Sequence, residues 1–77
     1  MKEDNIELEE IEIKTEYIKL DQLLKWANLV SSGAEAKDLI LNGDVKVNSE
    51  VELRRGRKIY EDYTVELFDN KIKIKRG

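Results

Sequence analysis

Residues 34–48 read A-E-A-K-D-L-I-L-N-G-D-V-K-V-N, and this stretch decides the fold of the chain. Ala36, Leu39 and Ile40 recur at the spacing of one helical face. Gly43 then stands where many helices end in a left-handed residue. After it the apolar period changes to two in V-K-V, which is typical of a strand. The stretch therefore predicts a helix that ends at a glycine and leads directly into a β-strand.

An earlier helix is predicted from the apolar spacing upstream. Leu20, Leu23, Leu24 and Ala27 lie at i, i+3, i+4 and i+7, which places them on one helical face. The connection over residues 28–31 is short, so the two helices must pack as a hairpin or a corner.

The start of the second helix carries its own signal. Ser32 and Glu35 have the S-x-x-E spacing of a capping box, in which a hydroxyl and a carboxylate satisfy free amides at the helix start. This spacing predicts that the helix begins directly after Ser32.

Short alternating segments follow the second helix. Val51 and Leu53 continue the alternation after a turn at Asn48-Ser49, where a serine at positive φ is costly, and this pattern predicts a hairpin. Further downstream the sequence predicts a strand at Ile59-Tyr60, a turn near Glu61-Asp62, a strand over Thr64–Phe68, and a turn at Asp69-Asn70 before the last strand.

The two ends of the chain have complementary patterns. Apolar residues alternate with glutamates over Ile6–Ile13, with a phase slip at Glu9-Glu10 that suggests a bulge. Lys71–Lys75 alternates with lysines instead. Because opposite charges on neighbouring strands attract, we expect these two segments to meet in one sheet. The expected fold is α+β: two helices packed on a small, mostly antiparallel sheet with an added N-terminal strand.

Composition excludes several functional classes. A chain of 77 residues forms one small domain without room for a deep catalytic cleft. It has no cysteine and no histidine, which excludes disulfides and removes the commonest general base and metal ligand. No apolar run approaches the roughly 20 residues that span a bilayer, and no signal peptide is visible. We therefore expect a cytoplasmic protein that is not an enzyme and needs no cofactor.

Charge is distributed unevenly along the chain. The formal net charge is -3, but residues 1–16 contain seven acids and two bases, so the remainder is mildly basic. Four of the five residues 54–58, R-R-G-R-K, are basic. Arginine donors suit phosphate oxygens, and Gly56 would let the backbone turn and approach a ligand. Taken alone, the run is either a phosphate-binding turn or a solvated loop.

The stretch Tyr17–Phe68, about two thirds of the chain, resembles the S4 RNA-binding domain. The matching segments, in order, are I-K-L-D-Q-L-L-K-W, S-S-G-A-E-A-K-D-L-I-L-N-G-D-V-K-V-N and R-R-G-R-K. The combination is most similar to the short stand-alone bacterial S4 proteins of the YaaA/YbcJ type. One departure, Ser32-Gly33 where many members carry a basic residue, weakens the implied phosphate grip.

The resemblance implies an S4-type (αL) two-helix motif that presents a basic surface to structured RNA. It divides the chain into an acidic N-terminal strand over 1–16, an S4-like RNA-binding domain over 17–68 and a basic strand over 69–77 that completes the same domain. The RNA-binding residues that it implies are Lys37, Lys46, Arg54, Arg55, Arg57 and Lys58.

The expected function is thus non-catalytic binding to the phosphate backbone of structured RNA, ribosomal or transfer RNA. We expect a monomer that associates with the ribosome. It should bind no membrane and take no small-molecule substrate. An alternative is a protein-interaction adaptor that docks an acidic protein on the same basic patch. DNA binding is less favoured because no base-reading helix is evident.

Other features leave two interpretations open. Trp26, Tyr60 and Tyr63 either pack at the core or stack on unpaired bases. The acidic residues of 7–12 form a solvated strand face or shield the basic surface, and Lys71, Lys73, Lys75 and Arg76 form either strand-edge partners for these acids or a second basic group.

Overall fold

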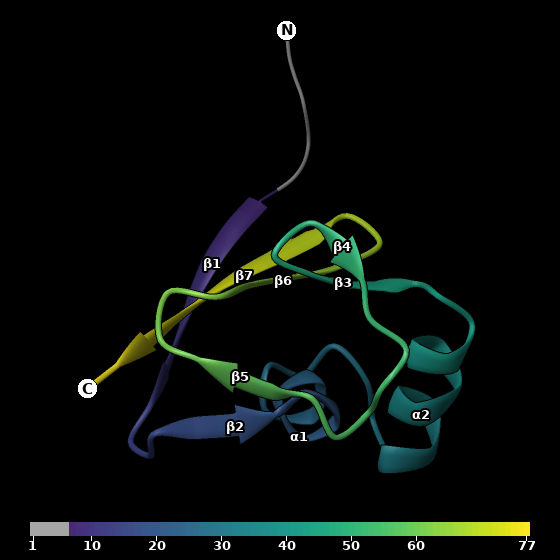
Figure 1. Cartoon of the computed structure of the whole chain (residues 1–77), viewed down its shortest axis with the longest axis horizontal. Helices are drawn as coiled ribbons and strands as arrows, with labels where there is room; N and C mark the ends of the chain where they lie inside the picture. Colours follow the sequence, from purple (N-terminus) through teal and green to yellow (C-terminus); the bar gives the residue numbers. More distant parts are fainter. Residues whose placement is uncertain (1–6) are drawn as a thin grey trace, which may run out of the picture.

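The computed structural model describes residues 7–77, which form two helices and seven strands (Figure 1). In chain order these are β1 (Glu7–Ile13), β2 (Tyr17–Lys19), α1 (Leu20–Trp26), α2 (Gly33–Leu41), β3 (Val45–Val47), β4 (Glu50–Val51), β5 (Lys58–Tyr60), β6 (Thr64–Leu67) and β7 (Asn70–Arg76).

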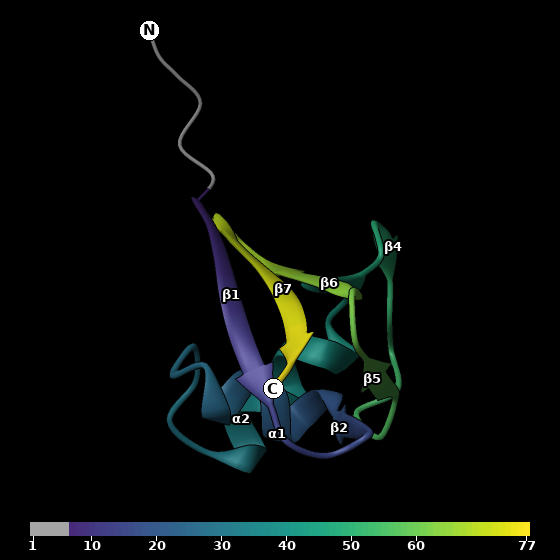
Figure 2. The same cartoon turned by 90° about the vertical axis from the view of Figure 1, so that its left-hand side faces the viewer.

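The strands form two sheets, which Figure 2 shows from the side of β1 and β7. The larger sheet has the order β1-β7-β6-β3-β4, and only its β1–β7 pair is parallel. The smaller sheet is the antiparallel pair β2–β5. The expected α+β fold is confirmed, with β2 as a strand that the sequence analysis did not anticipate.

The two ends of the described chain meet, as the complementary charges predicted. β1 pairs with β7 in continuous register from Glu7 opposite Asn70 to Ile13 opposite Arg76, so the predicted bulge is wrong. The phase slip has another cause, because Leu8 lies near the solvated start of the strand and is 57% exposed. Ile6, the first residue of the predicted strand, lies outside the described residues.

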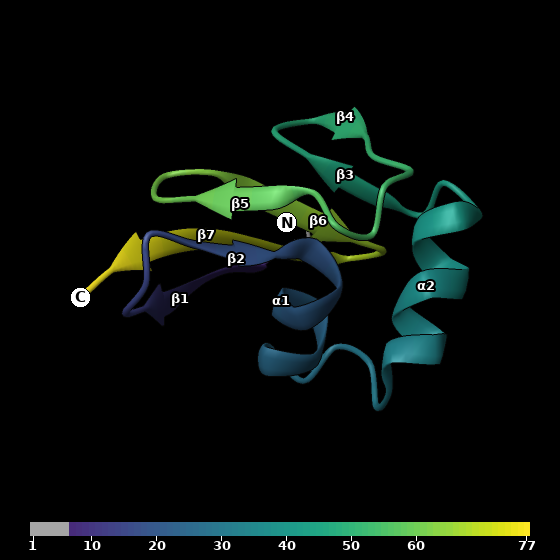
Figure 3. The same ribbon diagram turned by 60° about the horizontal axis from the view of Figure 1, so that its bottom comes forward.

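One hydrophobic core lies between the helices and one face of the larger sheet (Figure 3). Leu20, Leu23 and Leu24 of α1 are fully buried, which confirms the predicted apolar face. Ala36 and Ile40 of α2 are also fully buried, and the two helices pack against each other. Burying each large apolar side chain contributes about 1.5–3 kcal/mol, so this core stabilises the platform on which the candidate site lies.

Side chains fix the start of α2. The Ser32 hydroxyl accepts a hydrogen bond from the Glu35 N–H at 3.1 Å, as the capping spacing predicted. The Glu35 carboxylate reaches one residue further back than expected and accepts from the Ser31 N–H at 2.9 Å and from its hydroxyl at 3.0 Å. These two bonds, the backbone bond first, lower the pKa of Glu35.

The end of α2 explains why a glycine stands there. Gly43 has a φ of 83°, a left-handed conformation that strains residues with a Cβ. Its N–H donates to the Ile40 carbonyl at 3.1 Å, and the Asp44 N–H donates to the Leu39 carbonyl at 3.1 Å. These are the two bonds of a Schellman motif, and they redirect the chain from α2 into β3.

The β3–β4 turn uses two residues at positive φ, Asn48 at 52° and Ser49 at 74°. Asn48 also holds the turn against β6, because its side-chain oxygen accepts from the Thr64 N–H at 2.9 Å. The last turn differs from its predicted position: Asn70 already pairs with Leu67, so the connecting residues are Phe68 and Asp69.

Candidate nucleic-acid interface

The basic loop, residues 54–58, runs from β4 into β5 and is fastened to α1 through its backbone. The Leu20 N–H donates to the Arg57 carbonyl at 2.9 Å, and the Asp21 N–H donates to the Arg55 carbonyl at 3.1 Å. The first amides of a helix lack partners within the helix, and Lys19 at the N-cap supplies no side-chain acceptor. The basic loop therefore caps α1 with its carbonyl oxygens.

Glu52 orients the basic loop by accepting hydrogen bonds from two of its arginines. Its Oε2 accepts from the Nε of Arg54 at 2.9 Å and from the Arg54 N–H at 3.1 Å. Its Oε1 accepts from the Nη1 of Arg57 at 2.7 Å and from the Nη2 of Arg54 at 3.4 Å. One carboxylate thus orients two of the four basic side chains.

The environment of Glu52 keeps it charged. Its side chain is only 9% exposed, whereas those of Arg54 and Arg57 are 73% and 31% exposed. The pKa of Glu52 falls to about 2, chiefly because of the side-chain hydrogen bond from Arg54, with further lowering from the Arg54 N–H and from Arg57 and opposition from burial. Arg54 keeps most of its surface in solvent, where a ligand can reach it.

Three tyrosines form a row beside the basic loop. Tyr17 and Tyr60 face each other across the β2–β5 pair with ring centroids 5.7 Å apart, and Tyr63 lies 5.7 Å beyond Tyr60. The Nζ of Lys58 lies 4.9 Å from the centre of the Tyr17 ring, and the guanidinium carbon of Arg57 lies 5.8 Å from that of Tyr63. Cations therefore lie against both ends of the row.

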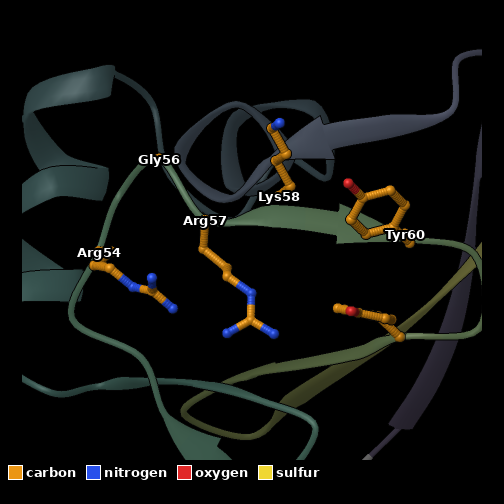
Figure 4. Close-up of a pocket in the computed structure, with 6 residues that line it drawn as sticks. Arg54, Gly56, Arg57, Lys58 and Tyr60 are labelled. Carbon is orange, nitrogen blue, oxygen red and sulfur yellow. The ribbon is translucent and has the colours of Figure 1, made fainter.

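An open groove of about 460 Å³ is lined by the arginines and by two of the tyrosines (Figure 4). We call it the basic groove, and its lining residues are Arg54, Gly56, Arg57, Lys58, Tyr60 and Tyr63. Figure 4 shows Arg54 and Arg57 projecting on the side of the groove nearer α2, with Tyr60 on the other side.

The structure brings together only part of the predicted site. Arg54, Arg57 and Lys58 line the basic groove, whereas Arg55 lies on the same loop, exposed, outside the lining.

The two predicted lysines lie on other elements. Lys37 is exposed on α2. Lys46 lies on β3 and faces the side of the sheet opposite to buried Val45 and Val47, in register with Glu66 of β6. Neither residue is among those that line the basic groove.

Gly56 does not have the predicted conformational role. Within the described residues Gly43 is the one glycine at positive φ, so the turn at Gly56 does not require a glycine. A Cβ built there meets nothing within 4 Å. A close approach of a ligand to this backbone stays a prediction.

Sequence reasoning missed Glu52 and Tyr17, and it left the roles of Tyr60 and Tyr63 open. The alternation drew attention to Val51 and Leu53, yet these are 53% and 54% exposed. The Glu52 N–H donates to the Val45 carbonyl at 3.0 Å, which fixes the pairing and turns Glu52 to the buried side. The available signal was a glutamate two residues before an arginine. The sequence did not show that its side chain points inward, because that depends on the strand register.

Two of the C-terminal lysines lie beside the acidic strand, as one of the two open interpretations held, but β7 is an inner strand between β1 and β6 and not an edge strand. Lys73 is in register with Glu10 and Lys75 with Glu12, and the Nζ of Lys75 lies 3.8 Å from a carboxylate oxygen of Glu10. Both partners are more than half exposed, so this pair contributes only about 0–1 kcal/mol.

Among residues 7–77, no three or more acidic side chains are placed to hold a metal ion. Within the same range, neither helix has the length and apolar character needed to cross a membrane.

Comparison with known proteins gives consistent matches. The S4 domain family matches residues 11–75. A curated relative, the probable ribosome maturation protein RlbA of Bacillus subtilis (strain 168), is 46% identical over 57 residues, which cover 74% of this chain and 80% of the relative.

A solved structure matches nearly the whole chain. The solution structure of YbcJ from E. coli, described as revealing an αL motif involved in RNA binding, superposes with a TM-score of 0.64 and 31% identity over 97% of this chain and 91% of YbcJ. These matches confirm the resemblance inferred from the helix, glycine and hairpin pattern, and the chain belongs to the S4 domain family.

Proposed function

We propose that this protein is a non-catalytic RNA-binding protein whose basic loop holds the phosphate backbone of structured RNA, ribosomal or transfer RNA. The observation that carries this proposal is that the loop is anchored twice, through its arginine side chains to Glu52 and through its backbone carbonyls to α1. The side chains of Arg54 and Arg57 are oriented before the ligand arrives, which reduces the entropy lost on binding.

Family membership supports the choice of RNA as the ligand. The YbcJ structure is described as carrying an RNA-binding motif, and the name of RlbA indicates ribosome maturation. Ribosomal RNA is therefore the first RNA to test. In this proposal Lys37 and Lys46 extend the contact along α2 and β3, and the protein acts as a cytoplasmic monomer.

The chemistry of the loop suits phosphate recognition. Arg54, Arg55 and Lys58 are exposed, so a ligand can reach their cationic side chains. Contacts of this kind read the shape and phosphate geometry of RNA, because the deep major groove of A-form RNA hides the base edges. Each neutralised phosphate releases counterions, so the affinity should fall steeply as salt concentration rises.

The test is a titration of labelled ribosomal and transfer RNA fragments over a salt series. The variant of choice is Arg55→Glu/Lys58→Glu, because it spares the two arginines that hold Glu52. A matched control, Lys14→Glu/Lys25→Glu, makes the same charge change at exposed positions outside the lining of the basic groove. Circular dichroism checks that both variants fold.

We expect salt-dependent binding by the wild type, a loss of at least about tenfold in the loop variant, and a much smaller loss in the control. Equal losses in both variants would show a diffuse charge effect and contradict the assigned site. If the wild type bound neither RNA at low salt, the adaptor function with an acidic protein partner would replace this proposal.

A further inference from the structure

The basic groove has two unlike walls, and phosphate binding uses only one of them. Arg54 and Arg57 supply the cationic wall, whereas Lys58 lines the groove with its side chain turned away from the two arginines. Tyr60 and Tyr63 supply an aromatic wall that a phosphate group does not need. The groove is open to solvent, and its volume of about 460 Å³ lies within the range of small-ligand sites, roughly 300–1,000 Å³.

The aromatic wall is rigid but not fully buried. Tyr17, Tyr60 and Tyr63 are each partly exposed, whereas the apolar residues of the core are nearly all inaccessible. β2–β5 pairing holds Tyr17 against Tyr60, and Tyr63 packs against the core. Ring surface therefore remains available in the groove. Because the rings are already fixed, they lose little conformational entropy when a ligand binds.

One ligand class matches both walls. A nucleotide joins a flat aromatic base to a phosphate, and bases stack on tyrosine rings and on guanidinium planes. The bases of a continuous duplex are covered by their neighbours, so only a base in a bulge, a loop or an end can enter a groove.

We propose that the basic groove takes one unpaired nucleotide of the RNA, with its base against Tyr60 and Tyr63 and its phosphate at Arg54. This inference rests on the proposed function and states which part of a structured RNA is recognised: a helical segment interrupted by an unpaired base. Shape and phosphates alone would then not account for the affinity.

The test compares three RNA hairpins with the same stem, measured by fluorescence anisotropy at one salt concentration. The first carries a single bulged adenosine, the second an abasic residue at the same position, and the third is fully paired. The bulged and abasic hairpins have the same backbone, so their ratio isolates the base. We expect the bulged hairpin to bind roughly 5- to 100-fold more tightly than the abasic one.

Two variants locate the effect. Tyr60→Leu keeps an apolar side chain but removes the ring, and it should reduce the ratio of bulged to abasic affinity to near one. Tyr60→Phe keeps the ring and should keep the ratio. As a second measurement, the Tyr60 ring protons should shift in NMR spectra with the bulged hairpin and not with the abasic one.

The outcomes separate this inference from the proposed function. Equal, salt-dependent binding of the bulged and abasic hairpins by the wild type overturns the nucleotide site and leaves the proposed function standing. No binding of any hairpin at low salt overturns both. Because the wild-type ratio decides the question, the test stands even if Tyr60→Leu fails to fold.

Discussion

The Oε1 atom of Glu52 lies 2.7 Å from the Nη1 atom of Arg57, beneath the loop that carries the candidate site. The Glu52 carboxylate thus holds the loop in place and partly neutralises the positive charge of the loop. A cationic loop without such an acid would repel itself, and its arginines would sample many orientations. The position of this pair leads directly to the first two predictions.

Replacing Glu52 by glutamine should destabilise the protein by about 1–3 kcal/mol, because the arginine donors lose a charged acceptor that is nearly excluded from water. Urea unfolding at neutral pH measures this loss. Glu50→Gln is the matched control, since Glu50 is exposed, and its effect should stay within about 0.5 kcal/mol. A Glu52→Gln variant as stable as the wild type would contradict the structural role of the pair.

Glu52 should also give the protein a specific sensitivity to acid. Its pKa is lowered to about 2 in the folded protein, so its contribution is present above the unfolded value of about 4.3 and is lost as the pH falls towards 2. The largest contribution is about 3 kcal/mol. Urea titrations between pH 6 and pH 2 should show this extra loss in the wild type and not in Glu52→Gln. Parallel curves for the two proteins would argue against a lowered pKa.

Substitutions at Arg55 and Arg57 should differ in their effects, because only the second should reduce stability as well as RNA binding. Arg55 forms no ion pair with the other described residues, so Arg55→Ala should weaken RNA binding and reduce the salt slope by about 1 without a change in melting temperature. Arg57→Ala should lower the melting temperature as well, because it removes a partner of Glu52. The two variants would disprove the division of roles if they behaved alike in both assays.

A side chain at position 43 should destabilise the protein. Gly43→Ala should cost about 1–2 kcal/mol, because its φ of 83° is strained for any residue with a Cβ. Gly33→Ala serves as the control, since Gly33 lies at the start of α2, has no neighbour within 4 Å of an added Cβ and is not at positive φ. Thermal unfolding of both variants measures the contrast, and equal effects would show that conformation is not the cause.

The C-terminal end of the acidic strand β1 should stabilise the fold, whereas its N-terminal end should contribute little. Ile13 is 5% exposed in the core, so Ile13→Ala should cost about 2–4 kcal/mol. Leu8 is 57% exposed, and Leu8→Ala should change stability by less than about 0.5 kcal/mol. Chemical denaturation distinguishes them. A large effect at Leu8 would indicate a contact of the strand start that the structure does not contain.

Local features were predictable from the sequence. The apolar spacing of Leu20, Leu23 and Leu24 and the glycine at position 43 specify helices and their ends through neighbouring residues alone. The meeting of β1 and β7 was also predictable, because the charge patterns of the two strands are complementary. Its parallel direction was not, since either direction places glutamates near lysines.

The organisation of the site depended on long-range pairing. Tyr17 reaches Tyr60 only because β2 pairs with β5, and a three-residue strand carries too little periodicity to be recognised. Glu52 turned inward because of its register with Val45, and a shift of one residue would have turned it to solvent. The sequence identified the basic loop and could not show what holds it.

The parallel pairing of β1 with β7 has a consequence for the way this protein is made. β1 leaves the ribosome before both helices and all the other strands, and its partner strand β7 follows only after them. The larger sheet therefore cannot be completed before β7 emerges, and until then Ile11 and Ile13 lack their neighbours on that strand. The glutamates that alternate with these isoleucines are charged residues of the kind that opposes aggregation of an unpaired apolar strand.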